Sequence, residues 1–227
     1  MIGVKEFINQ FKPKIDWDKK AKDKAKELGV SKDDILKEWE ESRQKGIEKG
    51  FKLEKQKQEE YNGLPNYVYH EYQKADESFL YNHENYIIEE GYIYDQKPFV
   101  HPKYDLIGIP DRVQVIDGCV YIDDFKSDKH IYKEGFVVKN GKFSMKMKMT
   151  NPISHLDLCN YNEYRLQLSL YMNLILSNNK TLRPGKLRIL HTIFDEDTLL
   201  PEQEVIEEVA YLRKEVLTIL NTLKKRV

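Results

Sequence analysis

Two aspartates and a lysine carry the clearest chemical signal in this sequence. Asp111 opens one β-rich run, and Asp124 and Lys126 close the next. Between the runs lies Asp117-Gly118, a dipeptide that strongly favours a two-residue β-hairpin loop. Such a loop sets the register so that Asp111 faces Asp124. Because side chains alternate along a strand, both aspartates and Lys126 would share one face at the open end of the hairpin.

Two carboxylates opposed at about 5 Å between their Cβ atoms repel each other, so they need a cation, a shared proton or open solvent. Magnesium binds oxygen ligands, usually one or two carboxylates completed by water and substrate phosphate. Lys126 would lie beside such a metal and could hold a water molecule or a phosphate oxygen. The arrangement is typical of metal-assisted phosphodiester hydrolysis. A solvated hairpin end with ordinary surface charges fits the hairpin pattern equally well.

Pro110-Asp111, followed by Asp124-Phe125-Lys126, resembles the bipartite motif of the PD-(D/E)xK nuclease superfamily. Gln167-Leu-Ser-Leu-Tyr171 resembles the Gln-x-x-x-Tyr helix motif that marks its RecB-like exonuclease branch. The resemblance implies an α/β (α+β) fold with a restriction-endonuclease-like core, in which a central mixed β-sheet is flanked by helices. It also suggests that the protein is phage-encoded.

The resemblance further implies roles for the residues of the hairpin. Asp111, Asp124 and the carbonyl group of Phe125 would bind Mg²⁺ or Mn²⁺. The metal would activate a water molecule and neutralise charge on the phosphate. Lys126 would position the attacking water and stabilise the phosphate in the transition state.

A helix is expected over Asn160–Ser177, where nearly every turn is apolar, so this helix should be largely buried. Gln167 interrupts the apolar run, and Tyr171 lies one turn later on the same side. A buried amide without partners costs about 1–3 kcal/mol. Gln167 therefore either bonds to backbone within the core or, as the resemblance implies, lies with Tyr171 beside the active site. There the two would orient DNA or the water around the metal.

One helix motif departs from the family pattern. Gly46–Glu54 resembles the Gly-Thr-x-x-His-x-x-x-Glu helix, whose His binds the metal or lies beside it, but Gly50 stands at the His position. His70 and His83 are candidate replacements, although a single His among aromatic residues is more often a packed core residue. Glu90 best matches the acid that family members often carry about one strand before the motif aspartate. An ordinary solvated turn acid fits Glu90 as well.

Periodicity and turn signals predict the elements that would hold these residues. Residues 1–60 are expected to form a charged N-terminal helical arm, and residues 61–227 the nuclease-like core. Within the core, we expect a helix over 67–81, a strand over 86–94, the central hairpin over 104–126, the helix over 160–177, a strand over 186–194 and a final helix that begins at Pro201. On the other face of the hairpin, Arg112 would form an exposed ion pair with Asp123.

A second hairpin, around Asn140-Gly141, is predicted as an insertion over residues 133–150. Its lysines form the densest basic patch outside the arm: Lys139, Lys142, Lys146 and Lys148. Such a ribbon could follow a nucleic-acid backbone, and an ordinary solvated strand face would look the same. Because the net charge is −1, DNA binding would depend on local patches of this kind.

Composition sets the remaining expectations. The chain has 227 residues, of which 33% are charged and 40% hydrophobic, so a full core with a heavily charged surface is expected. Cys119 and Cys159 provide neither a disulfide framework nor the spacing of a metal site. The N-terminus lacks a secretory signal and no segment is apolar enough to span a bilayer. We therefore expect a cytoplasmic protein without a membrane partner, in the host cytoplasm if it is phage-encoded.

The sequence thus predicts a Mg²⁺- or Mn²⁺-dependent deoxyribonuclease, an exonuclease by resemblance, that hydrolyses phosphodiester bonds of DNA. One alternative is a catalytically inactive nuclease-like domain that binds DNA or a partner protein within a larger assembly. Another is an endonuclease, which shares the chemistry and differs in how DNA is presented. Homo-oligomerisation stays open.

Overall fold

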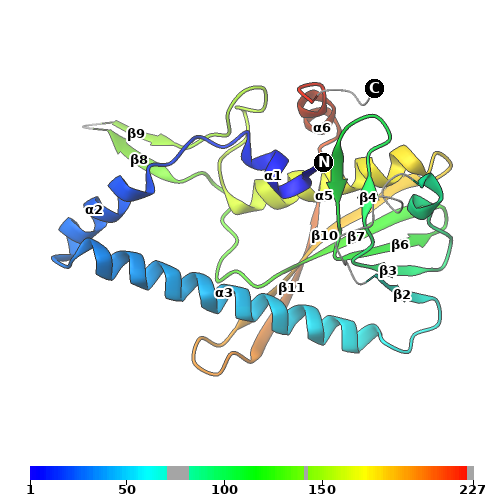
Figure 1. Ribbon diagram of the computed structural model, residues 1–227, viewed down its shortest axis with the longest axis horizontal. Helices are drawn as coiled ribbons and strands as arrows, with labels where there is room; N and C mark the ends of the chain where they lie inside the picture. Colours follow the sequence, from blue (N-terminus) through cyan, green and yellow to red (C-terminus); the bar gives the residue numbers. More distant parts are fainter. Residues whose placement is uncertain (71–81, 141–142, 224–227) are drawn as a thin grey trace.

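The computed structural model describes residues 1–70, 82–140 and 143–223 of the chain (Figure 1). Its helices are α1 (Val4–Asn9), α2 (Trp17–Leu28), α3 (Lys32–Tyr61), the 3₁₀ helix η1 (His83–Tyr86), α5 (Asn160–Asn178) and α6 (Arg213–Leu220). Its strands are β1 (Ile2–Gly3), β2 (Tyr67–Tyr69), β3 (Ile93–Asp95), β4 (Phe99–Val100), β5 (Leu106–Gly108), β6 (Arg112–Ile116), β7 (Cys119–Lys126), β8 (Val137–Asn140), β9 (Phe143–Lys146), β10 (Arg183–Phe194) and β11 (Pro201–Val209).

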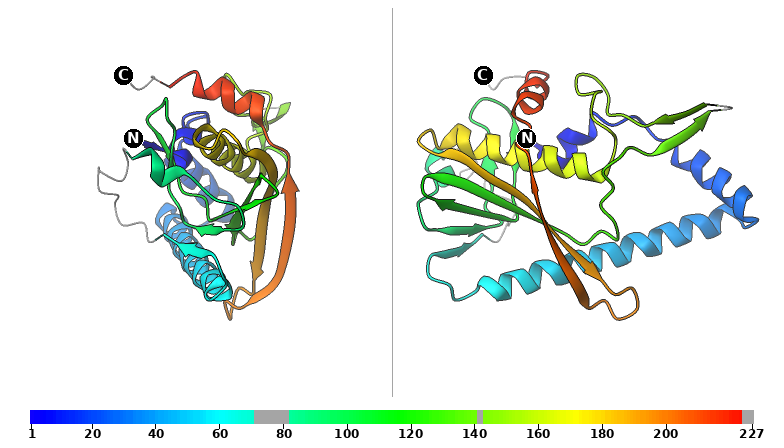
Figure 2. Two further views of the ribbon diagram at one scale, coloured as in Figure 1. Left: turned by 90° about the vertical axis from the view of Figure 1, so that its right-hand side faces the viewer. Right: turned by 180° about the vertical axis from the view of Figure 1, so that it is seen from behind.

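The central sheet has six strands in the order β11-β10-β7-β6-β3-β2. β10 runs parallel to β7 and β2 runs parallel to β3, whereas the other neighbours are antiparallel. α5 lies on one face of this sheet and α3 crosses the other (Figure 2). The expected class, a mixed α/β fold with a central mixed β-sheet flanked by helices, is therefore confirmed.

β6 and β7 form the predicted hairpin in the predicted register, which pairs Ile116 with Cys119. Asp117 and Gly118 form the loop with φ angles of 53° and 69°. A type I′ turn needs positive φ at both positions, and Asp and Gly are among the residues that tolerate it. Asp111 immediately precedes β6, so it lies at the open end of the hairpin.

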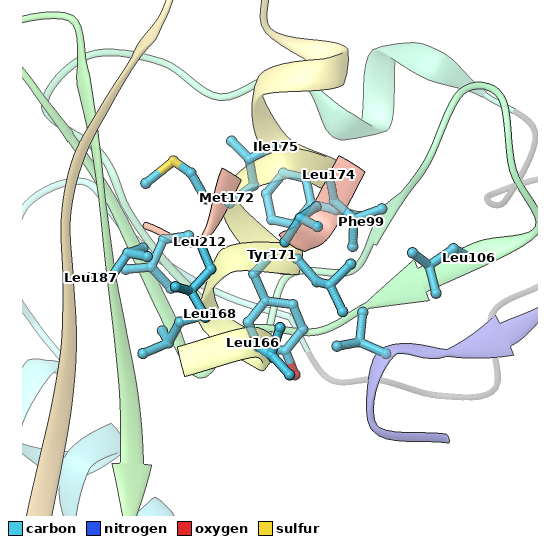
Figure 3. Close-up of a cluster of buried hydrophobic side chains, with 14 of the residues drawn as sticks. Phe99, Leu106, Leu166, Leu168, Tyr171, Met172, Leu174, Ile175, Leu187 and Leu212 are labelled. Atoms are coloured by element: carbon cyan, nitrogen blue, oxygen red, sulfur yellow. The ribbon is translucent and has the colours of Figure 1, made fainter. Parts of the chain in front are cut away.

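The core centres on α5, which confirms the helix expected over Asn160–Ser177. Its apolar side chains pack against the central sheet and against the elements that cover it, including α1, α6 and the small sheet β1-β5-β4 (Figure 3). The start of the chain belongs to this core, because Val4, Phe7, Ile8 and Phe11 are all buried there. α1 therefore packs on the body of the molecule, and the extended part of the N-terminal region is α2 and α3.

α2 and α3 form a helical arm with a small apolar cluster of its own, made by Ala21, Ala25 and Ile35. Ser31 begins α3 with a capping box, in which its hydroxyl accepts a hydrogen bond from the Asp34 backbone N (3.1 Å) and the Asp34 carboxylate accepts one from the Ser31 backbone N (3.1 Å). The second half of α3 reaches β7. Neither α3 nor any other described helix is long and apolar enough to cross a membrane.

The expectation of a final helix from Pro201 is wrong. Pro201–Val209 forms β11, antiparallel to β10, and α6 begins only at Arg213. The apolar residues of this segment fit a helical spacing, but two of them, Val205 and Ile206, are β-branched and 39% and 59% exposed. Pairing with the otherwise open edge of β10 explains the strand, because an unpaired edge offers a row of backbone hydrogen-bonding groups.

The segment after α3 also differs from expectation. Tyr67–Tyr69 forms β2 and does not begin a helix, and residues 71–81 of the expected helix lie outside the described residues. The strand expected over 86–94 is shorter, since η1 ends at Tyr86 and β3 begins at Ile93. Gly91 separates the two with a φ of 79°, in agreement with the break that the sequence predicts at Glu89-Glu90-Gly91.

Candidate active site

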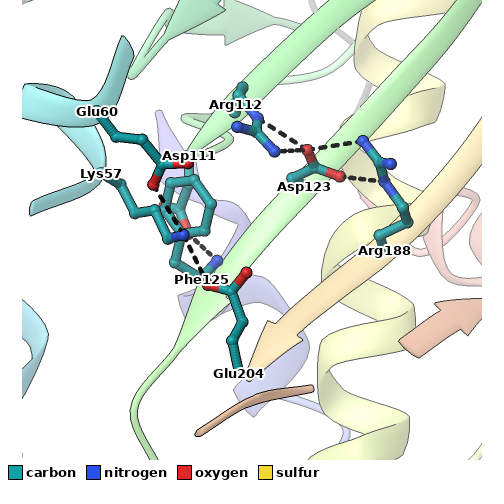
Figure 4. Close-up of polar contacts among 8 residues, drawn as sticks. All are labelled: Lys57, Glu60, Asp111, Arg112, Asp123, Phe125, Arg188 and Glu204. Carbon is teal, nitrogen blue, oxygen red and sulfur yellow. Dashed lines mark hydrogen bonds and ion pairs between the residues drawn. The ribbon is translucent and has the colours of Figure 1, made fainter. Parts of the chain in front are cut away.

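Asp111 is held at the open end of the hairpin by two neighbouring segments. Its Oδ2 accepts a hydrogen bond from the backbone N of Phe125 (2.6 Å; Figure 4), and its Oδ1 accepts one from Nε2 of Gln96 (3.3 Å). Phe125 directly follows Asp124 in β7. The backbone bond therefore fixes Asp111 beside the second aspartate, and the structure brings the two predicted carboxylates together.

Asp124 points toward α5 and is only 1% exposed. Its Oδ1 accepts a hydrogen bond from Nε2 of Gln167 (3.0 Å), and the same nitrogen donates to the hydroxyl oxygen of Tyr171 (3.0 Å). Gln167 and Tyr171 are one helical turn apart, so both face β7. The amide of Gln167 is thus bonded to side chains of this cluster, and the core does not satisfy it with backbone.

Lys126 completes the cluster and is 8% exposed. Its ammonium forms an ion pair with Oδ2 of Asp124 and lies 4.6 Å from the ring centroid of Tyr164 on α5. Burial acts to lower the pKa of Lys126, but the carboxylates of Asp124 and Asp111 outweigh it and hold the pKa above its ordinary value. The amine therefore stays protonated at neutral pH.

Lys126 forms the ion pair of this cluster, and the charge of Lys5 also acts on Asp111. Burial and the neighbouring Asp124 carboxylate raise the pKa of Asp111, although Lys126 and the hydrogen bond from the Phe125 backbone act to lower it. A carboxyl group that is disfavoured in its ionised form and lies beside a second carboxylate is a candidate for proton sharing or cation binding.

The donor atoms decide which cation fits. Asp111, Asp124 and the backbone carbonyl of Phe125 offer only oxygen, the ligand type that Mg²⁺ and Mn²⁺ prefer. No group of three or more His, Cys, Asp or Glu side chains that could enclose a metal exists among the described residues. An open site, in which water and substrate phosphate complete the coordination, fits the residues present.

Gly108, the last residue of β5, lets α5 pack closely against that strand just before Asp111. A Cβ atom at this position would lie 2.7 Å from side-chain carbons of both Tyr171 and Leu174. Both side chains are buried in the core, so neither can move away without repacking it. Sequence reasoning missed Gly108, although a glycine next to the motif Pro110-Asp111 is a cue for close packing.

Two cavities open beside the cluster. One, of about 310 Å³, lies on the α3 side, and its lining includes Glu54, Gln96 and Phe125. The other, of about 300 Å³, lies on the α5 side, and its lining includes Lys5, Lys126 and Gln167. Gln96 and Gln167 bond to Asp111 and Asp124 respectively, so each cavity is lined by a residue that contacts one of the two aspartates.

Comparisons of this chain with models of known protein families, with curated proteins and with solved structures each found no match. The case for a function therefore rests on the residues and their geometry.

The helix motif that departs from the family pattern lies on α3 beside the cluster. Gly50 faces open space, with no heavy atom within 4 Å of a Cβ placed there. One turn later, Glu54 lines the cavity on the α3 side. Enclosure by the cavity and the Asp95 carboxylate raise the pKa of Glu54, and the charges of Lys5 and Lys126 oppose the shift. The acid of the motif is therefore within electrostatic reach of the site.

The other candidate ligands lie elsewhere. Burial lowers the pKa of His70 to about 4, and its ring stacks on Tyr94 at 6.5 Å between centroids. His83 lies in η1 and packs edge-on against Tyr86, with the ring centroids 6.4 Å apart. Neither belongs to a group of metal-binding side chains within the described residues. The structure thus provides no described histidine in place of the family His.

Glu90, the candidate acid upstream of the motif, holds the closed end of the hairpin. Its carboxylate accepts hydrogen bonds from the backbone N of Asp117 (2.7 Å) and of Gly118 (3.0 Å). Both donors belong to the two-residue loop, at the end of the hairpin opposite Asp111. The alternative of a turn acid fits this position, and its function is to fix the loop.

The proposed basic ribbon is partly neutralised. Lys146 pairs with Glu134 (2.6 Å) and Lys148 pairs with Asp157, so two of its ammonium groups already have carboxylate partners. Lys139 lies in β8, paired along the backbone with Ser144, and Lys142 lies outside the described residues. The strand therefore presents less free positive charge than its composition implies.

The expected exposed ion pair between Arg112 and Asp123 is buried, and a second arginine joins it (Figure 4). Asp123 is 2% and Arg112 6% exposed. Asp123 accepts hydrogen bonds from Nε and Nη2 of Arg112 and from Nε (2.6 Å) and Nη2 (2.9 Å) of Arg188 on β10. The expectation of surface exposure is wrong because α3 covers this face, where Arg112 lies 4.3 Å from the ring centroid of Tyr61.

Proposed function

We propose that this protein is a Mg²⁺- or Mn²⁺-dependent deoxyribonuclease that hydrolyses phosphodiester bonds of DNA. One observation carries the proposal: Asp111 and Asp124 meet at the open end of a hairpin, and the pKa of Asp111 stays raised although the ammonium groups of Lys126 and Lys5 oppose the shift. Two acidic oxygen ligands, a missing positive charge and an adjacent protonated lysine are what metal-assisted attack on a phosphate requires. The oxygen-only donor set supports Mg²⁺ or Mn²⁺ as the cofactor.

In this proposal, Asp111, Asp124 and the Phe125 carbonyl would hold the cation, and a cation bound there would supply a more acidic water and charge neutralisation at the phosphate. Lys126 donates a hydrogen bond to the water or to a phosphate oxygen, where negative charge develops in the transition state. Gln167 fixes the orientation of the Asp124 carboxylate. Water adds to phosphorus, the bond from phosphorus to the leaving oxygen breaks, and that oxygen takes up a proton.

We also propose that the core is of the restriction-endonuclease-like type. The order of elements around the cluster supports it in part: β3, β6 and β7, then α5 and β10, follow the order of three strands, helix and strand expected from the resemblance. The helix expected before them, over 67–81, begins as strand β2 and otherwise lies outside the described residues, and β4 and β5 lie between β3 and β6. β11 and α6 follow where one further helix was expected, so the likeness covers the part of the fold that carries the cluster.

The test is DNA cleavage with a matched pair of lysine variants. Purified protein is incubated with end-labelled linear DNA and with closed circular DNA, in Mg²⁺, Mn²⁺ or EDTA. We expect cleavage only with a metal, and loss of linear DNA alone if the enzyme acts from ends. Lys126→Ala should lower the rate about 10²- to 10³-fold, the usual effect of removing one transition-state donor. Lys129→Ala, whose side chain is 69% exposed, should cut at the wild-type rate.

Cleavage by Lys126→Ala at the wild-type rate would contradict the proposed role of Lys126 in hydrolysis. A wild-type protein that cuts nothing with either metal but retards DNA in a gel would favour the inactive, DNA-binding alternative. Gly50, at the position of the family His, is the observation in favour of that alternative.

A further inference from the structure

The cavity on the α3 side has aromatic walls. Phe51 projects from α3 and is 68% exposed, although a phenylalanine normally packs in the core. Tyr69 of β2 is 45% exposed, and Phe125 of β7 closes the inner side. One side of the Phe125 ring already faces Lys57 and Arg112, at 6.0 Å and 5.5 Å from its centroid. The volume of about 310 Å³ is at the lower end of the range for small-molecule sites.

The charge of this cavity disfavours phosphate. Glu54 and Asp95 both line it, while its one lysine, Lys55, lies 3.8 Å from the carboxylate of Glu59. Asp95 is buried and accepts a hydrogen bond from the hydroxyl of Tyr67 (2.6 Å). The cavity on the α5 side is more basic, because Lys5, Lys12 and Lys126 line it with one carboxylate, Glu163, which pairs with Lys12 (2.5 Å). A ligand with a flat neutral part and an anionic part would therefore place its neutral part in the cavity on the α3 side and its anionic part outside that cavity.

Gln96 connects the aromatic cavity to the catalytic cluster. Its side chain lines the cavity and donates to Oδ1 of Asp111 (3.3 Å), and its backbone N donates to the carbonyl oxygen of Asp111 (3.1 Å). Its φ angle is 54°, in the left-handed region that residues other than glycine rarely adopt. Backbone strain of this kind persists only where the surroundings enforce it, and it concentrates at binding sites. A ligand in the cavity would therefore contact Gln96, which bonds directly to Asp111.

We propose that this cavity binds one unpaired nucleobase of the strand being cut, stacked on Phe51, while the adjoining phosphate lies at Asp111 and Asp124. The inference rests on the proposed function and deepens it by defining the substrate as a single-stranded or frayed DNA end. Every kind of base can stack on an exposed aromatic ring, and neighbouring amide groups can form hydrogen bonds to the edge of the base. A base within a duplex would first have to leave its stack, and this unfavourable step would slow the cleavage of intact duplex DNA.

The test measures stacking directly. Single-stranded oligonucleotides, each with 2-aminopurine at one position, are mixed with protein in Ca²⁺ or EDTA, and the fluorescence of the free base is compared with that of the complex. Stacking on an aromatic ring should quench one position. Phe51→Ala should abolish the quenching and weaken binding about 5- to 150-fold, the range for one base–aromatic stack. Phe51→Tyr, which keeps a ring, should quench as the wild type does.

Ile47→Ala is the matched control, because Ile47 lies on α3 one turn before Phe51, is 39% exposed and does not line the cavity. It should leave both quenching and affinity at wild-type values. Alanine favours helices, so neither truncation should unfold α3. In Mn²⁺, the ratio of single-strand to blunt-duplex cleavage should fall in Phe51→Ala and stay constant in Ile47→Ala.

Absence of quenching in the wild type, or equal quenching in Phe51→Ala, would overturn the inference even if the protein cuts DNA. Quenching that is lost in Phe51→Ala and kept in Ile47→Ala supports it. If that result comes with a protein that cuts no DNA in any metal, the base cavity stands and the proposed nuclease function fails.

Discussion

Two consecutive aspartates of β7, Asp123 and Asp124, meet very different surroundings. Both are almost completely buried, at 2% and 1% exposure. Asp123 points to the α3 side and is shared by two guanidinium groups, those of Arg112 and Arg188. Asp124 points to the α5 side, where it and Asp111 share the single ammonium of Lys126. Strand alternation alone places them on opposite faces.

The difference lies in the charge balance. The Asp123 cluster has more positive than negative charge, and bidentate arginine contacts satisfy its carboxylate without any external group. The Asp124 cluster has more negative than positive charge, which raises the pKa of Asp111 through burial and the Asp124 carboxylate. A buried carboxylate that is fully paired is structural, whereas a buried pair that lacks a cation is a candidate functional site.

The difference in charge balance between the two clusters is tested most strongly by the same substitution at each aspartate. Asp123→Asn leaves the buried guanidinium group of Arg112 and the partly buried one of Arg188 without their carboxylate, and should cost about 3–5 kcal/mol. For a chain of this size that lowers the melting temperature by about 6–20 °C. Asp124→Asn brings the other cluster to balance and should melt at or above wild type in EDTA. Thermal melts of the two variants measure both effects, and equal destabilisation would show that the two clusters do not differ in charge balance.

Gly108→Ala tests whether close approach of α5 is needed at the catalytic cluster and not at the other. The added Cβ would lie 2.7 Å from the Tyr171 ring, so the helix must shift or the ring must move. We expect a loss of about 1–3 kcal/mol in unfolding free energy, as for overpacking of a core. DNA cleavage should fall as well, because Tyr171 and Gln167 move with the helix. Stability and cleavage at wild-type values would show that the contact is not required.

The smallest expected effect is a pH dependence of stability without metal. The pKa of Asp111 is raised on folding, so the folded state holds its proton more tightly than the unfolded state. The stability from this group is complete below its ordinary pKa of 3.8 and is lost as pH rises through the raised value. In EDTA, the difference in unfolding free energy between wild type and Asp111→Asn should therefore fall as pH rises. Urea denaturation at several pH values measures it, and a constant difference would contradict the shift.

The hairpin and the helix motif could be read from sequence because their causes are local. Asp117-Gly118 determines the loop and hence the register of β6 and β7. The apolar run around Gln167 predicts a buried helix, and α5 places that amide on Asp124. Short-range turn chemistry and periodicity therefore accounted for the residues that meet at the cluster.

The features that sequence reasoning did not predict depend on which helix or strand covers each face of the sheet, and a local sequence pattern does not determine this. Arg112 and Asp123 were expected at the surface, and they are buried because α3 packs over them and Arg188 arrives from β10. The segment after Pro201 fits a helical spacing, yet it pairs with the open edge of β10. Gln96 has no sequence cue at all, since its contact with Asp111 depends on where β3 ends beside β6.

The most direct test of the central claim is a pair of melts, with and without Mg²⁺ or Mn²⁺, for wild type and Asp124→Asn. A cation that binds only the folded cluster stabilises it by about 2.7 kcal/mol at one hundred times its dissociation constant. Saturating metal should therefore raise the wild-type melting temperature by about 5–10 °C. Asp124→Asn, which lacks one ligand and the excess negative charge, should respond little. A wild-type protein that does not respond to metal, or an Asp124→Asn variant that responds equally, would show that Asp111 and Asp124 do not form a metal site.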